Sequence, residues 1–375
     1  MNKKLFCERC GNSDPELFFE LKSEQVCRCC LIFKGEVADF KERHITKQYI
    51  SLKYPLTLEQ DIISEKLLIE VQKSNSVLIN AVCGAGKTEI ITKLIKVYLD
   101  NNKRVGIVIP RKDLVIEIGF RMKNFFPKAV VTLVYGRHHE ELDGDIIIFT
   151  AHQAYRYKGL FEILIIDEID AFPYYNNQTL INIVKNACIG KTVCLSATPS
   201  QNDINNNTVL TLKRRYHLKD LPVPKTRYLD SFSMFFRLIK ELRKFNKRKK
   251  ICFIYVPTID MGLSLYYWLK FFIKGLINIS SKTSNREEII SNIHKGLYKC
   301  IITTTILERG VTFKGLQVIV YHAENNIFEE KTLIQMAGRV GRNFLEPDGE
   351  VIFLSTKHRE EIDNAIKTIF QANSL

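Results

Sequence analysis

Residues 81–88 read Ala-Val-Cys-Gly-Ala-Gly-Lys-Thr and have the residue types that bind the phosphates of a nucleotide. Glycines let backbone N–H groups approach phosphate oxygens, and a helix that begins here turns its N-terminal N–H groups to the same anion. Lys87 would reach the β- and γ-phosphates, and the Thr88 hydroxyl would help hold Mg²⁺. Ala81 replaces the first glycine of the usual pattern, and a small residue suffices there because it ends a strand. We assign binding of a nucleoside triphosphate with Mg²⁺ to Gly84, Ala85, Gly86, Lys87 and Thr88.

A pair of acids follows an apolar run later in the chain. Residues 163–166 are Ile-Leu-Ile-Ile, and Asp167 and Glu168 come next. The run predicts a buried strand that presents both acids at its carboxyl end, beside the phosphate loop. We expect Asp167 to hold Mg²⁺, directly or through water, and Glu168 to polarise the attacking water as general base. The sequence therefore predicts hydrolysis of the nucleotide as well as its binding.

Cysteines near the N-terminus have the spacing of metal ligands. Residues 7–10 read Cys-Glu-Arg-Cys, and residues 27–30 read Cys-Arg-Cys-Cys. Two CxxC turns supply four thiolates in the tetrahedral arrangement that Zn²⁺ prefers, and the metal would supply folding energy to a region with little apolar mass. Cys29 is an alternative to Cys30 as the fourth ligand, although the two-residue gap is the commoner spacing. We predict a closed, structural Zn²⁺ site at Cys7, Cys10, Cys27 and Cys30.

The composition limits the compartment and the class of partner. The 375 residues include 55 Lys and Arg against 41 Asp and Glu, a formal net charge of +14. This excess suggests nucleic acid or an acidic membrane surface as partner, although a solvated basic surface would show the same charge. No stretch has the roughly 20 apolar residues of a membrane span, and the N-terminus has no apolar core of a secretory signal. We therefore expect a reducing cytosol, where paired cysteines bind metal rather than form disulfides.

Strand-like apolar runs alternate with helical patterns and must position these residues. The runs are residues 76–81, 104–109, 145–149, 163–166, 250–256, 300–304, 318–321 and 351–354. Such alternation is typical of doubly wound parallel sheets. Residues 221–225, which contain two prolines, indicate a linker. We predict an α/β fold in three parts: a zinc-binding module at residues 1–45 and two doubly wound domains at residues 46–222 and 223–375.

The motifs, taken in order, resemble those of superfamily 2 helicases of the DEAD/DEAH-like kind. Asp-Glu-Ile-Asp at 167–170, Ser-Ala-Thr-Pro-Ser at 196–200 and Gln-Met-Ala-Gly-Arg-Val-Gly-Arg at 335–342 carry the resemblance, together with a phosphate loop that starts with Ala. The resemblance implies two tandem RecA-like domains with ATP between them. An arginine finger, which the second domain would supply, contributes several orders of magnitude in rate. The implied roles are coupling of the ATP state to domain movement for Ser196, Ala197 and Thr198, arginine finger for Arg342 and γ-phosphate partner for Arg339. Gln335 would be a further catalytic residue of the same motif.

The same resemblance implies a nucleic-acid face. The segment after the second strand would contact backbone phosphates, and the segment after the next strand would contact sugar and phosphate. Residues 303–313 match the motif that grips the strand, with Thr312 where many relatives have Asp. The residues implied to contact DNA are Arg111, Lys112, Thr150, His152, Gln153, Thr304 and Arg309; Glu308 and Gly310 align with the same motif, and Gly310 is assigned to nucleotide sensing.

Some features have more than one interpretation. Gln60 matches the glutamine that reads adenine in these motors, but Thr57 and Gln60 also form a capping-box pattern, and both interpretations can hold. Tyr155 and Tyr157 would stack on bases or belong to the core. The basic run at 243–250 is a solvated helix end, a DNA track or a contact with an anionic membrane.

The order of the parts resembles a narrower family. A four-cysteine module ahead of a two-domain helicase core, with Leu-Pro-Val-Pro at 221–224, is similar to the ComFA late competence proteins. This resemblance implies an ATP-driven motor that pulls transforming single-stranded DNA in beside a membrane channel. It also implies ComEC-like and ComFC-like protein partners. The location would be cytoplasmic, with peripheral association at the inner face of the cell membrane as an open alternative.

Two other functions are open. One is a replication-restart or repair helicase like PriA, in which the zinc-binding insertion lies late in the chain. The other is a zinc-dependent nucleic-acid-binding scaffold with a vestigial ATPase. The intact Lys87, Asp167, Glu168 and Arg342 argue against the scaffold, and a lack of ATP hydrolysis with single-stranded DNA would favour it.

Overall fold

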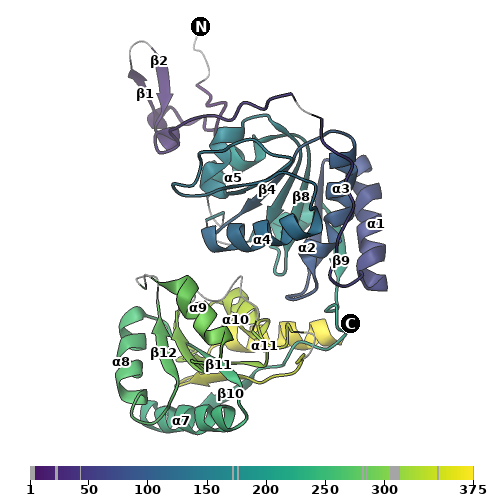
Figure 1. Ribbon diagram of the computed structural model, residues 1–375. Coiled ribbons are helices and arrows are strands. Elements are labelled where there is room, and N and C mark those ends of the chain that lie inside the picture. The colour runs from purple at the N-terminus through teal and green to yellow at the C-terminus, as the bar shows by residue number, and fades with distance from the viewer. Residues whose placement is uncertain are drawn as a thin grey trace. The chain divides into compact units, whose positions relative to one another are not determined.

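The computed structural model describes residues 5–21, 24–42, 44–170, 173–174, 177–280, 283, 285–304, 313–343 and 346–374. The chain forms two compact units, each with its own parallel sheet (Figure 1). The first unit consists of Met1–Ala81 and Gly86–Leu212, and the second of Val82–Ala85 and Lys213–Leu375. The predicted α/β class with two parallel sheets is confirmed.

The sheet of the first unit has seven strands in the order β5-β6-β4-β7-β8-β3-β9, and its strand pairs are parallel. Two of its central strands, β4 and β6, are buried at every position, which explains their unbroken apolar sequences. Because β8 lies between β3 and β7, the carboxyl ends of three neighbouring strands carry the loop, the Ser-Ala-Thr motif and the acids. The strand bounds are Ser76–Ala81 (β3), Val105–Ile109 (β4), Val131–Val134 (β5), Ile146–Thr150 (β6), Phe161–Asp167 (β7), Cys188–Ser196 (β8) and Thr208–Leu212 (β9).

The helices of the first unit begin where the sequence offers a cap or a loop. Thr57 and Gln60 form the predicted capping box at the start of α1, each side chain bonding the other residue's backbone N–H. The phosphate loop leads directly into α2, and Ile91 joins α2 to α3. The bounds are Leu58–Lys73 (α1), Lys87–Ile90 (α2), Thr92–Asp100 (α3), Lys112–Phe125 (α4), Ala151–Tyr157 (η3, a 3-10 helix), Gln178–Lys185 (α5) and Gln201–Asn205 (α6).

The N-terminal segment packs onto the first unit. It contains two 3-10 turns and an antiparallel strand pair: η1 (Pro15–Leu17), β1 (Phe18–Leu21), β2 (Glu24–Cys27) and η2 (Arg28–Cys30). Cys10, Cys27, Phe33 and Ala38 belong to the same buried cluster as residues of β6, β7 and α5. The segment therefore shares the core of the first unit.

The sheet of the second unit has six strands in the order β10-β15-β14-β11-β13-β12, and its strand pairs are also parallel. Helices α7 and α8 pack on one face of this sheet and share a buried cluster, while Figure 1 shows α10 on the other face. The bounds are Lys225–Tyr228 (β10), Ser231–Lys247 (α7), Ile251–Tyr255 (β11), Ile259–Leu269 (α8), Leu276–Ile279 (β12), Arg286–His294 (α9), Cys300–Thr303 (β13), Leu316–Tyr321 (β14), Glu330–Ala337 (α10), Val351–Ser355 (β15) and Glu360–Asn373 (α11).

Every helix in the described part of the chain is too short or too polar to cross a bilayer.

Candidate nucleotide, metal and nucleic-acid sites

The phosphate loop has the backbone conformation that its glycines allow. Gly86 caps the N-terminus of α2 with a φ of +81°, in the left-handed region that L side chains rarely adopt. A Cβ atom at Gly86 would collide with the side-chain amide of Gln60. Lys87 is half-buried and Thr88 is buried at the start of the helix. Gln60 is itself buried, so its amide lies against the loop while its side-chain oxygen completes the cap of α1.

The acids at the end of β7 connect to the Ser-Ala-Thr motif at the end of β8. Asp170 accepts hydrogen bonds from the hydroxyls of Ser196, at 2.7 Å, and Thr198, at 2.6 Å. Asp167 accepts one from the backbone N–H of Glu168, at 2.9 Å. Glu168 has a φ of +51°, which is unusual for a residue with a side chain and is often found at functional sites. Asp170, to which sequence reasoning assigned no role, is thus the side chain that ties the two motifs together.

The arginine motif occupies the end of α10 and the turn after it. Gln335 and Arg342 are half-buried, and Arg339 is 2% exposed. The Nε of Arg342 donates to the carbonyl of Gly338 at 2.9 Å. Gly341 has a φ of +71°, and a side chain there would collide with the carbonyl of Pro347, which explains the glycine.

Three consecutive residues hold the backbone of this motif, and we call Arg215, Tyr216 and His217 the carbonyl clasp. The guanidinium of Arg215 donates to the carbonyls of Val340, at 2.7 Å, and Gly338, at 3.1 Å. Burial lowers the pKa of Arg215 to about 10, so it stays charged at neutral pH. No recognised motif marks these residues, and only a basic stretch after β9 could have drawn attention to them.

The other two members of the clasp bond to the next carbonyls of the motif. The hydroxyl of Tyr216 donates to the carbonyl of Arg342 at 2.5 Å. The Nε2 of His217 lies 2.7 Å from the carbonyl of Gly341, and it must carry the proton because a carbonyl only accepts. Its Nδ1 is then free to accept from the backbone N–H of Lys219, at 3.2 Å. The clasp therefore fixes the backbone from which the motif's arginines project.

Five of the residues predicted to contact DNA follow two neighbouring strands of the first unit. Arg111 and Lys112 begin α4, directly after β4, and Lys112 is exposed. Thr150 ends β6, which pairs with β4, and is buried, whereas His152 is exposed. Gln153 is half-exposed, and Thr304 follows β13 in the second unit. Glu308, Arg309, Gly310 and Thr312 lie outside the described residues.

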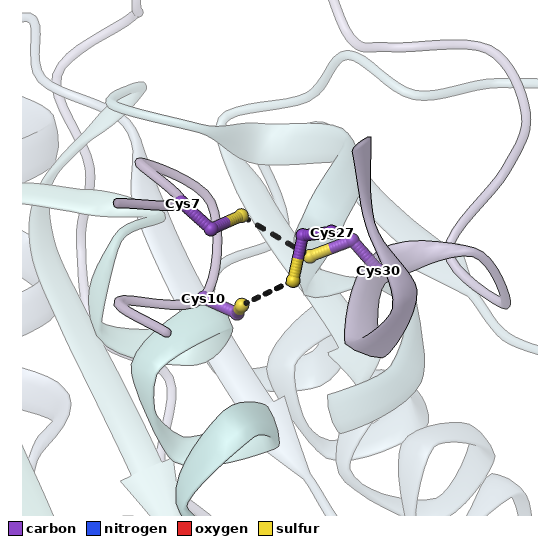
Figure 2. A group of neighbouring side chains, drawn as sticks. All are labelled: Cys7, Cys10, Cys27 and Cys30. Atoms are coloured by element: carbon purple, nitrogen blue, oxygen red, sulfur yellow. Dashed lines mark hydrogen bonds between the residues drawn. The ribbon is translucent and has the colours of Figure 1, made fainter. Parts of the chain in front are cut away.

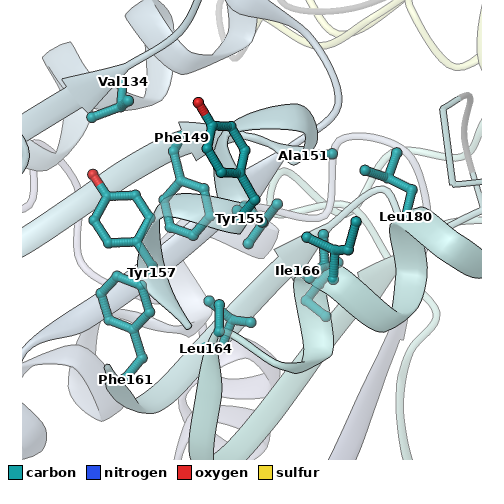
Figure 3. Close-up of a cluster of buried hydrophobic side chains, with 14 of the residues drawn as sticks. Val134, Phe149, Ala151, Tyr155, Tyr157, Phe161, Leu164, Ile166 and Leu180 are labelled. Carbon is teal, nitrogen blue, oxygen red and sulfur yellow. The ribbon is translucent and has the colours of Figure 1, made fainter. Parts of the chain in front are cut away.

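The two tyrosines after β6 belong to the core. Figure 3 shows Tyr155 and Tyr157 among the apolar side chains of the first unit, beside Phe149 and Phe161. Tyr157 is fully buried, and its ring centroid lies 4.8 Å from that of Phe149. Burial raises the pKa of Tyr157 above its ordinary value. Of the two interpretations, stacking on bases is therefore wrong for these rings and core packing is confirmed.

The four predicted metal ligands meet at one point. The sulfur atoms of Cys7, Cys10, Cys27 and Cys30 all lie within 4.8 Å of one another (Figure 2). The Sγ–Sγ distances are 3.6 Å for Cys7 and Cys30 and 3.6 Å for Cys10 and Cys27. Tetrahedral Zn–S bonds of about 2.3 Å place sulfurs about 3.8 Å apart, so the cluster is compatible with zinc. Cys30, and not Cys29, supplies the fourth sulfur of this cluster.

The thiols of this cluster have shifted pKa values. Burial raises the pKa of Cys10 to about 11 and raises that of Cys30 still further. Burial also acts to raise the pKa of Cys27, but hydrogen bonds with Asn12 and Cys10 outweigh it and the pKa falls below its usual value. A bound cation would favour the thiolate in all of them.

The N-terminal segment that carries the four cysteines is hydrogen-bonded to α5 and η3. Asn182 of α5 donates to the carbonyl of Cys10 at 2.7 Å, and Asn186 donates to the carbonyl of Arg9 at 2.8 Å. Past the second CxxC turn, the hydroxyl of Tyr155 donates to the carbonyl of Lys34 at 2.6 Å. The N-terminal segment is therefore joined to the short helix that carries His152 and Gln153.

Known protein families match the parts of the chain that contain these motifs. The family described as "Type III restriction enzyme, res subunit" matches residues 53–201, and "Helicase conserved C-terminal domain" matches residues 233–344. Competence protein ComFA of Streptococcus pneumoniae is 33% identical, with 99% of this chain and 90% of that protein covered. The chain belongs to the ComFA family. ComFA of Bacillus subtilis is 31% identical, with 100% of this chain and 87% of that protein covered.

The fold of this ComFA-family protein is that of RecA-like helicases. The structure titled "S. cerevisiae Dbp5 bound to RNA and ADP BeF3" matches with a TM-score of 0.65 and 16% identity, over 85% of this chain and 92% of that chain. At that identity the likeness shows the fold alone. The predicted resemblance to superfamily 2 helicases is confirmed, and its helicase domains are of the ATP-dependent, nucleic-acid-binding kind.

Proposed function

We propose that this protein is an ATP-driven motor on single-stranded DNA that acts in DNA uptake during natural competence. The observation that carries the proposal is the similarity to competence protein ComFA of S. pneumoniae over 99% of the chain. Such a motor must hydrolyse ATP, hold a strand and couple the two events. The described residues support each requirement separately.

For hydrolysis, we propose that the phosphate loop binds the phosphates and that the acids after β7 activate water. Lys87 binds the β- and γ-phosphates, Glu168 polarises the attacking water, and Gly84, Ala85 and Gly86 donate backbone N–H groups. Mg²⁺ bound with the nucleotide neutralises phosphate charge, and Thr88 and Asp167 would hold it. Gln60 reads the adenine with its amide, which the burial of this side chain against the loop supports.

For coupling, we propose roles for two motifs. Arg342 acts as arginine finger and Arg339 as its γ-phosphate partner, with Gln335 as a further residue of that motif. The clasp supports this because it holds the carbonyls of the same turn. Ser196, Ala197 and Thr198 respond to the nucleotide, and the bonds of Asp170 to two of them give a direct link to the acidic motif. Gly310 is proposed to sense the nucleotide.

For strand binding, we propose contacts from two neighbouring strand ends of the first unit and from the segment after β13 of the second. Phosphate and sugar contacts of this kind position a strand without reading its sequence. The pairing of β4 with β6 supports a continuous track, because it brings the ends of both strands to one edge of the sheet. The proposed contacts are Arg111, Lys112, Thr150, His152, Gln153, Thr304 and Arg309.

We also propose that the four-cysteine cluster binds a structural Zn²⁺ ion. The sulfur geometry supports this, and a closed set of four thiolates leaves no position for catalysis. We further propose that the zinc-binding module ends at residue 45 and that the two domains meet at residue 222. We also propose partners like ComFC and ComEC. The proposed location is cytoplasmic, with peripheral contact at the inner face of the membrane.

The test is the ATPase rate of the full chain with single-stranded DNA, duplex DNA or no DNA. We expect single-stranded DNA to stimulate turnover most. Lys87→Ala should abolish turnover and leave DNA binding largely intact, because the lysine contacts only the nucleotide. Lys66→Ala, at an exposed position of α1, is the matched control. Wild-type turnover in the Lys87 variant, or none in the unaltered protein, would overturn the proposal.

A further inference from the structure

A large apolar surface on the second unit has no role in the proposed motor. Phe271 is 75% exposed, Phe232 is 73% exposed and Trp268 is 65% exposed. Soluble proteins rarely expose contiguous apolar patches of this kind unless they bind something there. We use the name aromatic face for a set of exposed side chains: Phe232, Phe236, Leu263, Tyr267, Trp268, Phe271, Phe272 and Leu297.

Ring contacts join the two sides of this face across α7 and the segment after α8. The ring of Phe236 contacts those of Phe232, at 4.8 Å between centroids, and Phe235, at 5.8 Å. Phe235 in turn lies 6.1 Å from Phe272, just beyond the end of α8. On α8, residues four apart share one side of the helix, which aligns Leu263 with Tyr267. Beyond the end of α8, Lys270 lies beside the rings of both Tyr267 and Phe271. The two helices therefore present one surface.

A basic hollow of about 580 Å³ adjoins this surface. Its wall combines the apolar Phe272, Ile273 and Leu297 with the cations of Arg243, Lys274 and Lys299. Within the described residues, none of these three cations takes part in an ion pair, whereas Lys244 and Arg248 of the same basic run pair with Glu350. The charges beside the aromatic face are therefore available to an external anion.

Cations also lie among the aromatic rings, whereas the nearby acids, Asp230 and Asp260, lie at the starts of α7 and α8. Residues 261–275 contain Lys270 and Lys274 but no Asp or Glu. The ammonium of Lys270 lies 4.9 Å from the ring centre of Tyr267 and 5.4 Å from that of Phe271. Long side chains with apolar stems and charged tips beside aromatic rings are typical of surfaces that enter the headgroup region of a bilayer.

We infer that the aromatic face and its basic hollow bind an anionic phospholipid bilayer. The rings and leucines would enter the boundary between headgroups and acyl chains, and the cations would meet phosphate and anionic headgroups. A single-stranded DNA track fits less well, because Leu263 and Leu297 offer no ring for bases to stack on. The face also lies across the sheet from the arginine motif of α10.

This inference deepens the peripheral membrane contact in the proposed function by assigning it a surface. It does not depend on ATP turnover. Loss of vesicle binding with normal DNA-stimulated ATPase would count against the inference alone, and loss of ATPase with normal vesicle binding would count against the motor alone.

The single tryptophan of the chain provides the measurement. Trp268 lies in the aromatic face and is exposed to water, so its emission should shift to the blue when it enters lipid. We expect this shift with phosphatidylcholine vesicles that contain roughly 30% phosphatidylglycerol, because an anionic membrane surface attracts basic residues. We expect little change with vesicles of phosphatidylcholine alone. Brominated acyl chains should quench the shifted emission.

Variants separate the apolar and charged contributions. Leu263→Ser with Phe271→Ser should abolish the shift and the flotation of the full chain with anionic vesicles. Arg243→Glu with Lys274→Glu should weaken partitioning by more than tenfold, since each basic residue near the surface contributes about fivefold. Phe370→Ser, at an exposed position of α11 in the same unit, is the matched control and should bind like the unaltered protein.

Two results would overturn the inference. One is an unchanged emission and no flotation with anionic vesicles, while DNA-stimulated ATPase shows that the protein is folded. The other is an oligodeoxythymidine strand that quenches Trp268 and displaces the vesicles, which would make the face a nucleic-acid surface.

Discussion

Single residues outside the recognised motifs determine how the arginine motif is held. Arg215, Tyr216 and His217 bond to consecutive carbonyls of the turn that carries Arg339 and Arg342. Hydrogen bonds to a backbone turn restrict the positions that its side chains can reach. We therefore propose that the members of the clasp are positioning residues, which would act on the arginines without touching the nucleotide.

Tyr216→Phe should lower the turnover number of the ATPase and leave the KM for ATP nearly unchanged. The substitution removes only the hydroxyl that bonds to the carbonyl of Arg342, a loss of about 1 kcal/mol, or about fivefold in rate if the bond is needed only in the transition state. Steady-state kinetics with saturating single-stranded DNA would measure it. Tyr49→Phe, on an exposed ring of the first unit, is the control. Equal turnover in both variants would contradict a positioning role.

Acidic pH should weaken the second unit through His217. Burial lowers the pKa of this ring in the folded chain, so the folded state takes up its proton at a lower pH than the unfolded state. The contribution of the neutral ring to stability is therefore fully present above the ordinary histidine pKa of about 6.5 and is lost as the pH falls below it. Unfolding by urea at pH 7.5, 6.5 and 5.5 should show a smaller loss for His217→Gln than for the unaltered protein. Parallel losses would contradict this assignment.

At the scale of elements, the cysteine cluster and η3 form one connected structure. The guanidinium of Arg156 donates to the carbonyl of Glu36, and its Nε donates to the side-chain oxygen of Gln153 at 2.6 Å. The backbone N–H of Ala38 donates to the carbonyl of Arg156 at 2.8 Å. The segment that carries the four cysteines therefore contacts the short helix that carries two of the proposed DNA contacts.

Cys7→Ser should release the metal and increase the mobility of η3. Removing one of four thiolates opens the cluster, and the residues after the second CxxC turn then lose the support that holds Tyr155 and Arg156. Amide hydrogen exchange at residues 151–157 should become faster, and zinc content measured by mass spectrometry should fall. Cys29→Ser is the matched control, because this thiol lies outside the cluster. If amide exchange at η3 is unchanged although the metal is lost, the cysteine cluster does not support η3.

At the scale of the whole molecule, the net charge of +14 predicts salt-sensitive binding of DNA. Each phosphate contact made by Lys or Arg releases condensed counterions. The binding constant for single-stranded DNA should fall with rising salt, with a slope of about 0.7 per phosphate contact on logarithmic axes. Lys112→Ala should reduce the slope by about 0.7. Fluorescence anisotropy at salt concentrations from about 50 to about 200 mM would measure this slope. An unchanged slope would remove Lys112 from the contacts.

The spacing of residues close together in the sequence was sufficient to predict many features of this protein. The phosphate loop, the acids after β7, the two CxxC turns and the buried strands follow from residues close together in the chain, because loops, caps and apolar runs are formed by neighbours. The same motifs predicted the helicase superfamily and the ComFA family, both of which the comparisons confirm. The roles of the site residues stay predictions.

Packing decided what spacing left open. Cys30 completes the sulfur cluster because η2 turns it inward, and Tyr155 and Tyr157 are core residues because η3 lies over the apolar side chains of β6 and β7. The carbonyl clasp joins residues more than a hundred positions apart, and the aromatic face joins two helices with no shared motif. Contacts of this kind depend on which segments the folded chain brings together, and a linear pattern carries no record of them.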